Sequence, residues 1–271
     1  PLPPATTILE GIKSKVSPAT EVLYTKGSGI REPENIEEAK ELAKKSDAAV
    51  VVVGEPAYVH EFWTVQDIIS SMGQIQKEGL DALRKRLLAR LEQFPCRMML
   101  DLPQSQLNLI KAVHETGTPA IVVLITGRPL TIKWIAETIP AILMGYLPGT
   151  EGGNAVADVL FGDYTPGGKL PISIARSMGQ LPVRYDYKPY PFAEMLPPAY
   201  APLFEFGFGL SYTRFEYDDL KVSPSKVGPS GNVNVGVTVR NIGERIGDEV
   251  IQLYINDLYS SRVTPLRELK G

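Results

Sequence analysis

The residues best suited to acid–base chemistry form a short stretch, Gly54-Glu-Pro-Ala-Tyr-Val-His-Glu-Phe-Trp63, directly after the apolar run Ala48–Val53. It holds two carboxylates, Glu55 and Glu61. The second lies among the aromatic residues Tyr58, Phe62 and Trp63. Because an apolar setting disfavours an ionised carboxyl group, we expect the pKa of Glu61 to be raised, as a general acid requires. Glu55 adjoins the apolar run and is predicted to be structural, accepting hydrogen bonds from loop amides. An exposed loop carboxylate is the alternative for Glu61.

Three other features invite a functional interpretation. Arg128, in Gly127-Arg-Pro129, follows another apolar run and is predicted to form a structural salt bridge, although functional residues also gather at strand ends. His60 and His114 are the two histidines; neither lies in an acidic cluster, so we predict no metal site, and His114 is expected on a helix surface. The glycine-rich turn Gly149–Gly153 lacks the spacing of a nucleotide-binding loop, and Glu151 would repel phosphate at the following helix.

Composition narrows the class of protein. The chain has 271 residues, 44% hydrophobic and 22% charged, which is typical of a globular protein with a core. A net charge of −3 with a pI near 5.6 argues against a nucleic-acid partner. No segment approaches the roughly 18 apolar residues of a membrane-spanning helix, so no membrane partner is expected. The lone Cys96 excludes an intrachain disulfide.

The elements that must position these residues alternate between strand and helix. Short apolar or β-branched runs predict strands at Glu21–Tyr24, Ala48–Val53, Ala120–Ile125 and Ala141–Met144. Apolar stripes at helical spacing predict helices at Thr6–Lys15, Asn35–Ser46, Pro103–Thr116, Leu130–Glu137 and Glu151–Phe161. This alternation predicts an α/β fold, with a mostly parallel sheet flanked by helices and strands covered on both faces.

Two regions depart from this alternation. Residues 64–94 carry a leucine stripe opposite charged residues and are predicted to be a helical insertion that packs on the domain surface, with packing against a partner absent from this chain as the alternative. The Pro- and Tyr-rich stretch 185–202 is expected to be an ordered linker. Beyond it, alternating segments at Phe215–Val222, Asn232–Arg240 and Val250–Asp257 predict half-buried antiparallel strands of an incomplete β-sandwich. We therefore expect one domain over residues 1–203 and a linker with a partial β-sandwich over 204–271.

Several motifs closely resemble those of glycoside hydrolase family 3, the β-glucosidase and β-xylosidase group. They are Ser46–Glu55, Leu100-Asp-Leu-Pro-Gln-Ser-Gln106, Gly117–Pro129, Leu147-Pro-Gly-Thr-Glu-Gly-Gly153 with its continuation to Ser173, and Phe204-Glu-Phe-Gly-Phe-Gly-Leu-Ser-Tyr-Thr213. The first four resemble the family's second, α/β-sandwich domain. The last resembles the junction with its fibronectin type III-like domain.

The resemblance implies roles for particular residues. In this family the acid/base is a Glu on a loop of the second domain, and Glu61 takes that position; His60, Trp63 and Arg97 then become candidate substrate-binding residues. The nucleophile is an Asp on an N-terminal (β/α)8 barrel, which this chain does not contain. Cys96-Arg97 corresponds to the family's Ser-Arg pair, which here is separated from Glu61 by the helical insertion. A retaining mechanism needs the two carboxyl groups about 5–5.5 Å apart.

The resemblance thus implies part of an exo-acting, retaining β-glycosidase that hydrolyses terminal β-linked glucosyl or xylosyl units. This chain would supply the acid/base, need no cofactor, and depend on a barrel domain for the nucleophile; the family suggests a secreted or periplasmic location. One alternative is a noncatalytic carbohydrate-binding or interaction module that kept the fold and lost the site. Another is a flavodoxin-like ligand-binding domain, which would bind flavin or nucleotide.

Overall fold

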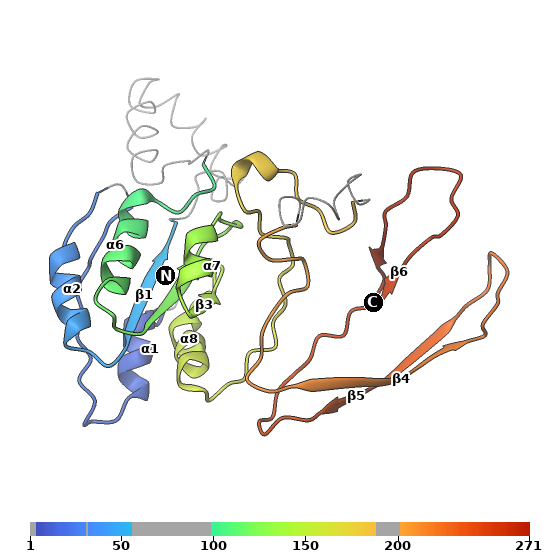
Figure 1. Ribbon diagram of the computed structural model, residues 1–271. Helices are drawn as coiled ribbons and strands as arrows, with labels where there is room; N and C mark the ends of the chain where they lie inside the picture. The colour runs from blue at the N-terminus through green and yellow to red at the C-terminus, as the bar shows by residue number, and fades with distance from the viewer. Residues whose placement is uncertain (1–3, 31, 56–98, 188–200) are drawn as a thin grey trace, which may run out of the picture. The chain divides into compact units, whose positions relative to one another are not determined.

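A computed structural model describes residues 4–30, 32–55, 99–187 and 201–271 (Figure 1). The chain forms two compact units. Unit 1 comprises Pro1–Ala5, Val16–Gly152 and Ile174–Val183. Unit 2 comprises Thr6–Lys15, Gly153–Ser173 and Arg184–Gly271.

A parallel sheet forms the centre of unit 1. Its strands β1 (Ala49–Gly54), β2 (Ala120–Ile125) and β3 (Ala141–Met144) are hydrogen-bonded in the order β1-β2-β3. Val53 pairs with Leu124, which in turn pairs with Met144. The predicted α/β fold with a parallel sheet is therefore confirmed, and three predicted strands are present within one residue of their expected bounds.

Three helices of unit 1 accompany these strands. In the chain, α2 (Ile36–Lys44) precedes β1, α6 (Gln104–His114) lies between β1 and β2, and α7 (Lys133–Thr138) lies between β2 and β3. α6 lies against α2 and covers part of β1 and β2 (Figure 1). Its apolar stripe, Leu109, Ile110 and Val113, is buried. The helix ends before Gly117, whose φ of 80° is a backbone conformation that glycine adopts readily.

Two expectations about the sheet are wrong. Glu21–Tyr24 is not a strand, and Leu23 and Tyr24 are 37% and 61% exposed. β1 is not covered on both faces, because Val50 and Val52 are 37% and 44% exposed while Val51 and Val53 are buried. β2 lies between the other two strands and is the best-buried of the three, with Val122, Val123 and Leu124 fully buried.

Two helices in unit 2 pack closely through glycines. They are α1 (Ile8–Lys15) and α8 (Gly152–Phe161). The first residue of α8, Gly152, belongs to unit 1, and the rest of the helix belongs to unit 2. A Cβ at Gly11 would lie 2.2 Å from the carbonyl oxygen of Gly153, so only glycine permits this approach. The Lys15 ammonium then lies between the carboxylates of Asp158 and Asp163.

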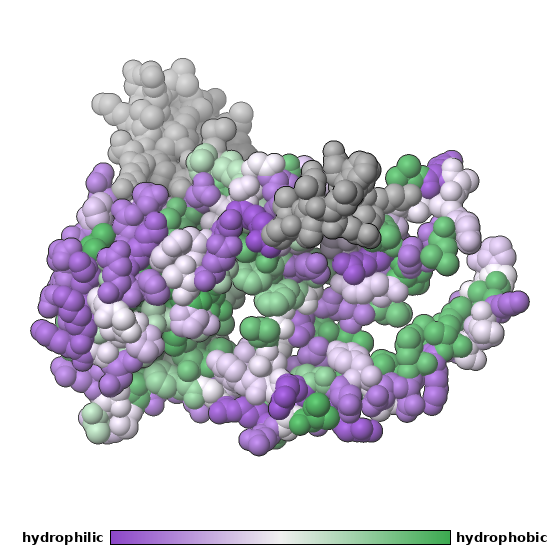
Figure 2. All heavy atoms as spheres, in the orientation of Figure 1, coloured by the Kyte–Doolittle hydropathy of each residue, from purple (hydrophilic) through white to green (hydrophobic). Residues whose placement is uncertain are grey.

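The rest of unit 2 contains small antiparallel sheets. β4 (Phe215–Ser223) pairs with β5 (Asn234–Asn241), and β6 (Tyr254–Ile255) pairs with β7 (Glu268–Leu269). The antiparallel pairing is thus confirmed, but Val250–Asp257 is a strand only at β6. The predicted half-burial of β5 is also wrong, since Val235 and Val237 are 40% and 36% exposed. Apolar side chains are visible along this hairpin in Figure 2.

Some predicted features stay predictions. The helical insertion at 64–94, and residues 188–200 of the expected linker, lie outside the described residues. The expected domain boundary at residue 203 is likewise untested. Within the described ranges, no helix has the length and apolar character needed to cross a membrane.

The burial of β2 predicts a large cost for truncating Leu124, which is 0% exposed. Leu124→Ala should lower the free energy of unfolding by about 2–5 kcal/mol, because it removes buried methyl groups and leaves a cavity. Leu147→Ala, at a residue 57% exposed, should change it by about 0.5 kcal/mol or less. Urea denaturation of the two variants measures the difference, and equal losses would contradict the assigned core.

The end of β1 predicts a second effect on stability. A Cβ at Gly54 would lie 1.7 Å from the carbonyl oxygen of Ile125, and the Gly54 φ of 156° is one that side chains disfavour. Gly54→Ala should therefore destabilise the chain by about 1–3 kcal/mol or more. Gly168→Ala is the matched control, because no atom lies within 4 Å of its added Cβ. Thermal unfolding that gives the same Tm for both variants would refute this close approach.

Candidate functional site

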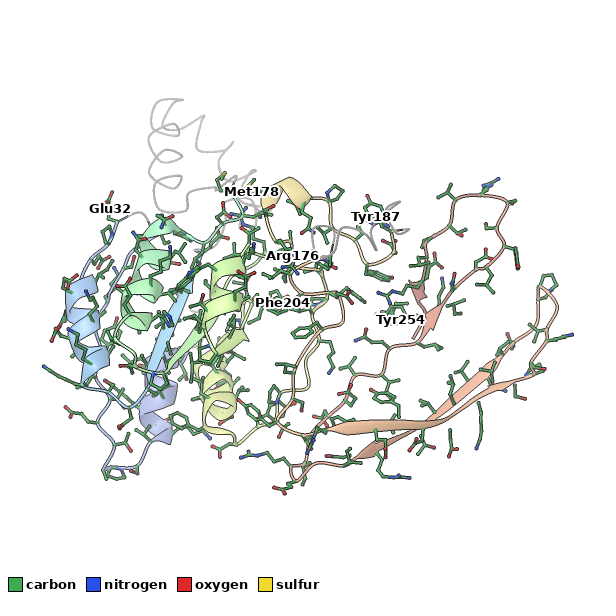
Figure 3. All side chains as sticks on the ribbon, in the orientation of Figure 1. Glu32, Arg176, Met178, Tyr187, Phe204 and Tyr254 are labelled. Atoms are coloured by element: carbon green, nitrogen blue, oxygen red, sulfur yellow. The ribbon has the colours of Figure 1, made fainter. Side chains whose placement is uncertain are left out.

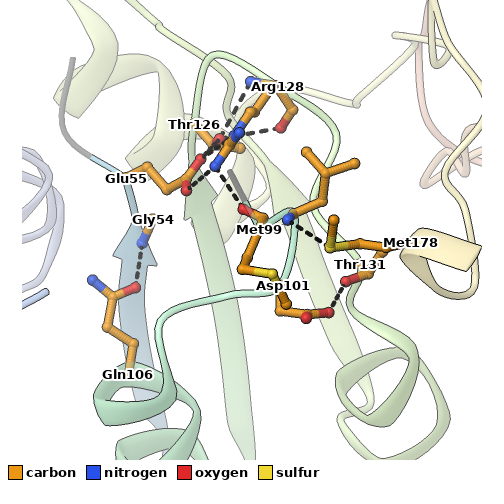
Figure 4. A network of polar contacts seen from close by, with 10 residues as sticks. Gly54, Glu55, Met99, Asp101, Gln106, Thr126, Arg128, Thr131 and Met178 are labelled. Carbon is orange, nitrogen blue, oxygen red and sulfur yellow. Dashed lines mark hydrogen bonds and ion pairs between the residues drawn. The ribbon is translucent and has the colours of Figure 1, made fainter. Parts of the chain in front are cut away.

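Polar groups gather where the three parallel strands end. Glu55 follows β1, the segment Thr126–Arg128 follows β2, and Tyr146 lies shortly after β3. Since the carboxyl ends of parallel strands share one edge of a sheet, these groups are brought together although they are far apart in the sequence. This edge is where ligands bind in many open α/β sheets, and it carries the polar network of Figure 4.

The centre of this network is an ion pair between Glu55 and Arg128. Arg128 Nε donates to Glu55 Oε2 at 2.8 Å, and Arg128 Nη2 donates to Glu55 Oε1 at 2.7 Å. The Glu55 side chain is 0% exposed and that of Arg128 is 22% exposed. Such a two-point contact fixes both side chains, and a buried carboxylate needs a partner of this kind. Both Glu55 oxygens are therefore engaged within the protein.

Two further side chains hold the strand ends in register. The Thr126 hydroxyl is fully buried; it lies 3.4 Å from Glu55 Oε2 and accepts a hydrogen bond from the Arg128 N–H at 3.3 Å. Gln106 is also buried, and its Oε1 accepts a hydrogen bond from the Gly54 N–H at 2.9 Å. The end of β1 is thus fixed from two sides, by α6 and by the connection after β2.

The segment that leads into α6 is attached to the same connection. Arg128 Nη2 also donates to the carbonyl oxygen of Met99 at 2.8 Å. Thr131 N–H donates to the Leu100 carbonyl at 2.9 Å, and the Thr131 hydroxyl donates to Asp101. On the other side, Leu100 N–H approaches the sulfur of Met178, whose place is marked in Figure 3, at 3.5 Å.

Tyr146 has an unusual conformation at the same edge. Its φ of 50° is rarely adopted by a bulky residue, and its carbonyl accepts a hydrogen bond from the Thr126 N–H at 3.1 Å. Its hydroxyl is buried and finds no hydrogen-bond partner in the described part of the chain. Burial raises the pKa of this hydroxyl above its ordinary value, so the group stays protonated at neutral pH.

A cavity of about 260 Å³ lies between the first turns of α6 and α7 in unit 1. Its lining includes Asp101, Gln104, Thr131, Trp134 and Arg176. Lys111 Nζ lies 5.2 Å from the centre of the Trp134 ring, and the ring of His114 meets it edge-on at 6.0 Å. Trp134 is therefore held by α6, and the cavity combines an aromatic edge with charged groups.

The structure accounts for some of the sequence predictions. Arg128 forms the predicted structural salt bridge, and His114 lies exposed on α6 as expected. Glu55 is structural as predicted, and within the described part of the chain its carboxylate accepts hydrogen bonds from Arg128 and Thr126. Among the described residues, no cluster of three or more metal-ligating side chains occurs.

The four predicted site residues Glu61, His60, Trp63 and Arg97 lie outside the described residues. Sequence reasoning did not single out Thr126, Gln106 or Tyr146. For Thr126 and Gln106 the sequence did contain a signal, because each belongs to a motif that resembles the family. Thr126 directly follows the predicted strand Ala120–Ile125, and Gln106 is the last residue of the motif Leu100–Gln106. The strained backbone of Tyr146 had no such signal.

The amino-acid sequence is similar to curated β-xylosidases and β-glucosidases over nearly the whole chain. A β-xylosidase of Formosa agariphila is 40% identical over 282 aligned residues, which cover 100% of this chain and 34% of that protein. The periplasmic β-glucosidase of Salmonella typhimurium is 36% identical over 298 aligned residues, covering 98% of this chain and 35% of that protein. The chain therefore spans about a third of the length of these curated relatives.

Solved structures of β-glucosidases also resemble this chain. A β-glucosidase from Erythrobacter marinus has a TM-score of 0.80 and 31% identity, covering 99% of this chain and 36% of that one. A β-glucosidase from Listeria innocua in complex with isofagomine has a TM-score of 0.75 and 28% identity, covering 97% and 34%. The sequence model of the glycosyl hydrolase family 3 C-terminal domain matches residues 2–212. The chain thus belongs to glycosyl hydrolase family 3, and it carries the C-terminal domain of that family.

Proposed function

We propose that this chain supplies the general acid/base, Glu61, of an exo-acting, retaining β-glycosidase. The observation that carries the proposal is the state of its nearest rival. Glu55 is buried, and both of its oxygens accept hydrogen bonds from Arg128, so this carboxyl group is not available to protonate a substrate oxygen. Glu61 is the other carboxylate in the stretch Gly54–Trp63, whose first residue ends β1 at the edge where α/β proteins bind ligands.

The proposed chemistry divides two carboxyl groups between two domains. Glu61 protonates the leaving oxygen while an Asp on a (β/α)8 barrel attacks the anomeric carbon. Glu61 then removes a proton from the water that hydrolyses the glycosyl-enzyme intermediate, which gives retention of configuration. The names of the relatives, β-xylosidase and β-glucosidase, favour terminal β-linked xylosyl or glucosyl units as substrates.

The same proposal assigns the substrate-binding residues, the domains and the partner. His60, Trp63 and Arg97 bind the substrate beside Glu61. Residues 1–203 form the α/β-sandwich domain, and residues 204–271 form a linker and part of a fibronectin type III-like domain. The barrel domain is the principal partner, and the reaction needs no cofactor.

The proposal predicts the behaviour of the isolated chain. With one of the two catalytic carboxyl groups, the chain alone should not hydrolyse aryl β-glucosides faster than its Glu61→Gln variant, because no nucleophile can form the intermediate. Release of the phenol, followed by absorbance, measures this rate. Rapid hydrolysis that is abolished by a substitution within residues 1–271 would mean that both carboxyl groups lie in this chain and would refute the division.

A second prediction concerns Glu61 in the full-length protein. Glu61→Ala should lower kcat/KM for natural disaccharides by about 10²–10⁴-fold, the usual contribution of positioned proton transfer. A dinitrophenyl glycoside should be affected much less, since its leaving group needs little protonation. Added azide should raise turnover of the dinitrophenyl glycoside, because it attacks the anomeric carbon of the glycosyl-enzyme intermediate in the space left by the Glu61 carboxylate.

Glu137→Gln is the matched control for this experiment, because Glu137 is a carboxylate of α7 in the same unit, is 56% exposed, and lies outside the polar network at the sheet edge. It should leave the ratio of the two substrates unchanged. If Glu61→Ala slows both substrates equally, or if Glu137→Gln gives the selective loss instead, the acid/base is misassigned. Full activity in Glu61→Ala would favour the noncatalytic module.

A further inference from the structure

We infer that Arg128 is a positioning residue for the acid/base, because it binds the two described residues that flank the segment 56–98 in the sequence. This inference rests on the proposed function, because Glu61 belongs to that segment. Glu55 immediately precedes the segment and Met99 immediately follows it. Both residues are bound by the same guanidinium group, that of Arg128 (Figure 4).

The geometry at Arg128 is specific. A single nitrogen, Nη2, donates to Glu55 Oε1 at 2.7 Å and to the Met99 carbonyl at 2.8 Å. Nε completes the contact with Glu55 Oε2 at 2.8 Å. A planar guanidinium is rigid, so these three hydrogen bonds set the separation of Glu55 and Met99 and the orientation of the Glu55 carboxylate. A lysine ammonium on a flexible stem would not impose the same geometry.

Arg128 is itself held in place from the backbone. Its N–H donates to the buried Thr126 hydroxyl at 3.3 Å, and Thr126 N–H donates to the Tyr146 carbonyl at 3.1 Å. Three residues further on, Thr131 binds the Leu100 carbonyl and the Asp101 carboxylate. The connection between β2 and α7 therefore holds both Glu55 and the stretch Met99–Asp101 in place.

The consequence for catalysis follows from distance along the chain. Glu61 lies six residues beyond Glu55, so the direction in which the chain leaves β1 limits where its carboxyl group can be placed. Proton transfer requires heavy atoms within hydrogen-bond reach, and a misplacement of about 1 Å can cost roughly 10²-fold in rate. Loss of Arg128 should therefore impair protonation of the leaving group more than substrate binding or nucleophilic attack.

The test is the ratio of kcat/KM for a disaccharide to kcat/KM for the dinitrophenyl glycoside, measured in the full-length protein. Arg128→Met should lower this ratio by about 10- to 100-fold while the dinitrophenyl glycoside is still cleaved. In a Glu61→Ala background the same substitution should not lower the ratio further, because Arg128 acts through the group already removed. A purely structural role would slow both substrates together.

Lys169→Met is the matched control. Lys169 forms a partly buried ion pair with Glu249 at 3.3 Å, with both side chains 15% exposed, in the other unit. Its loss should lower the Tm but leave the substrate ratio unchanged. Arg128→Met leaves the buried Glu55 carboxylate without its ion-pair partner. The double variant Glu55→Gln/Arg128→Met therefore serves as a second test, because it removes the guanidinium without leaving that charge unpaired. Its ratio should fall in the same way.

The outcomes separate this inference from the proposed function. If Glu61→Ala lowers the ratio but a folded Arg128 variant keeps the native value, Arg128 does not position the acid/base and the inference is wrong. If Arg128→Met or the double variant lowers the ratio and Glu61→Ala does not, another residue is the acid/base. In that case the positioning role of Arg128 stands and the assignment of Glu61 falls.

Discussion

The buried ion pair between Glu55 and Arg128 is the interaction on which the described edge of the sheet depends. It joins the end of β1 to the connection after β2, and through Met99 it reaches the segment that begins α6. Removing one partner of a buried pair commonly costs about 3–5 kcal/mol, because the other charge stays buried without compensation. The pair therefore enforces one arrangement of the strand ends, whether or not it adds net stability.

The parallel sheet gives this pair its setting. The centre of β2 is fully buried, so the residues that follow this strand start from a rigid position. Gly54 allows the end of β1 to approach Ile125 so closely that a Cβ would clash, and this brings Glu55 within reach of Arg128. Gln106, from α6, then holds the Gly54 amide. Precise contacts of this kind are what a general acid needs from the elements around it.

Membership of glycosyl hydrolase family 3 fits this division of labour. In the proposed mechanism, the α/β unit with its rigid sheet edge presents one catalytic group, while a second domain presents the other. The chain spans about a third of the length of its curated relatives, which leaves room in such proteins for the barrel domain that we propose carries the nucleophile. The sheet edge is the part of the proposed site that this chain can position.

The sequence by itself determined the α/β class, three strands within one residue of their bounds, the helices that connect them, and the family. The helical spacing of apolar residues and the runs of β-branched residues are local signals, so these features needed no tertiary information. The strand predicted at Glu21–Tyr24 and the burial of Val50, Val52 and β5 were wrong, because pairing and coverage depend on which elements meet in space. For the same reason, the tertiary structure alone identified Arg128 as the partner of both Glu55 and Met99: these three residues are distant in sequence and meet because parallel strands share one edge.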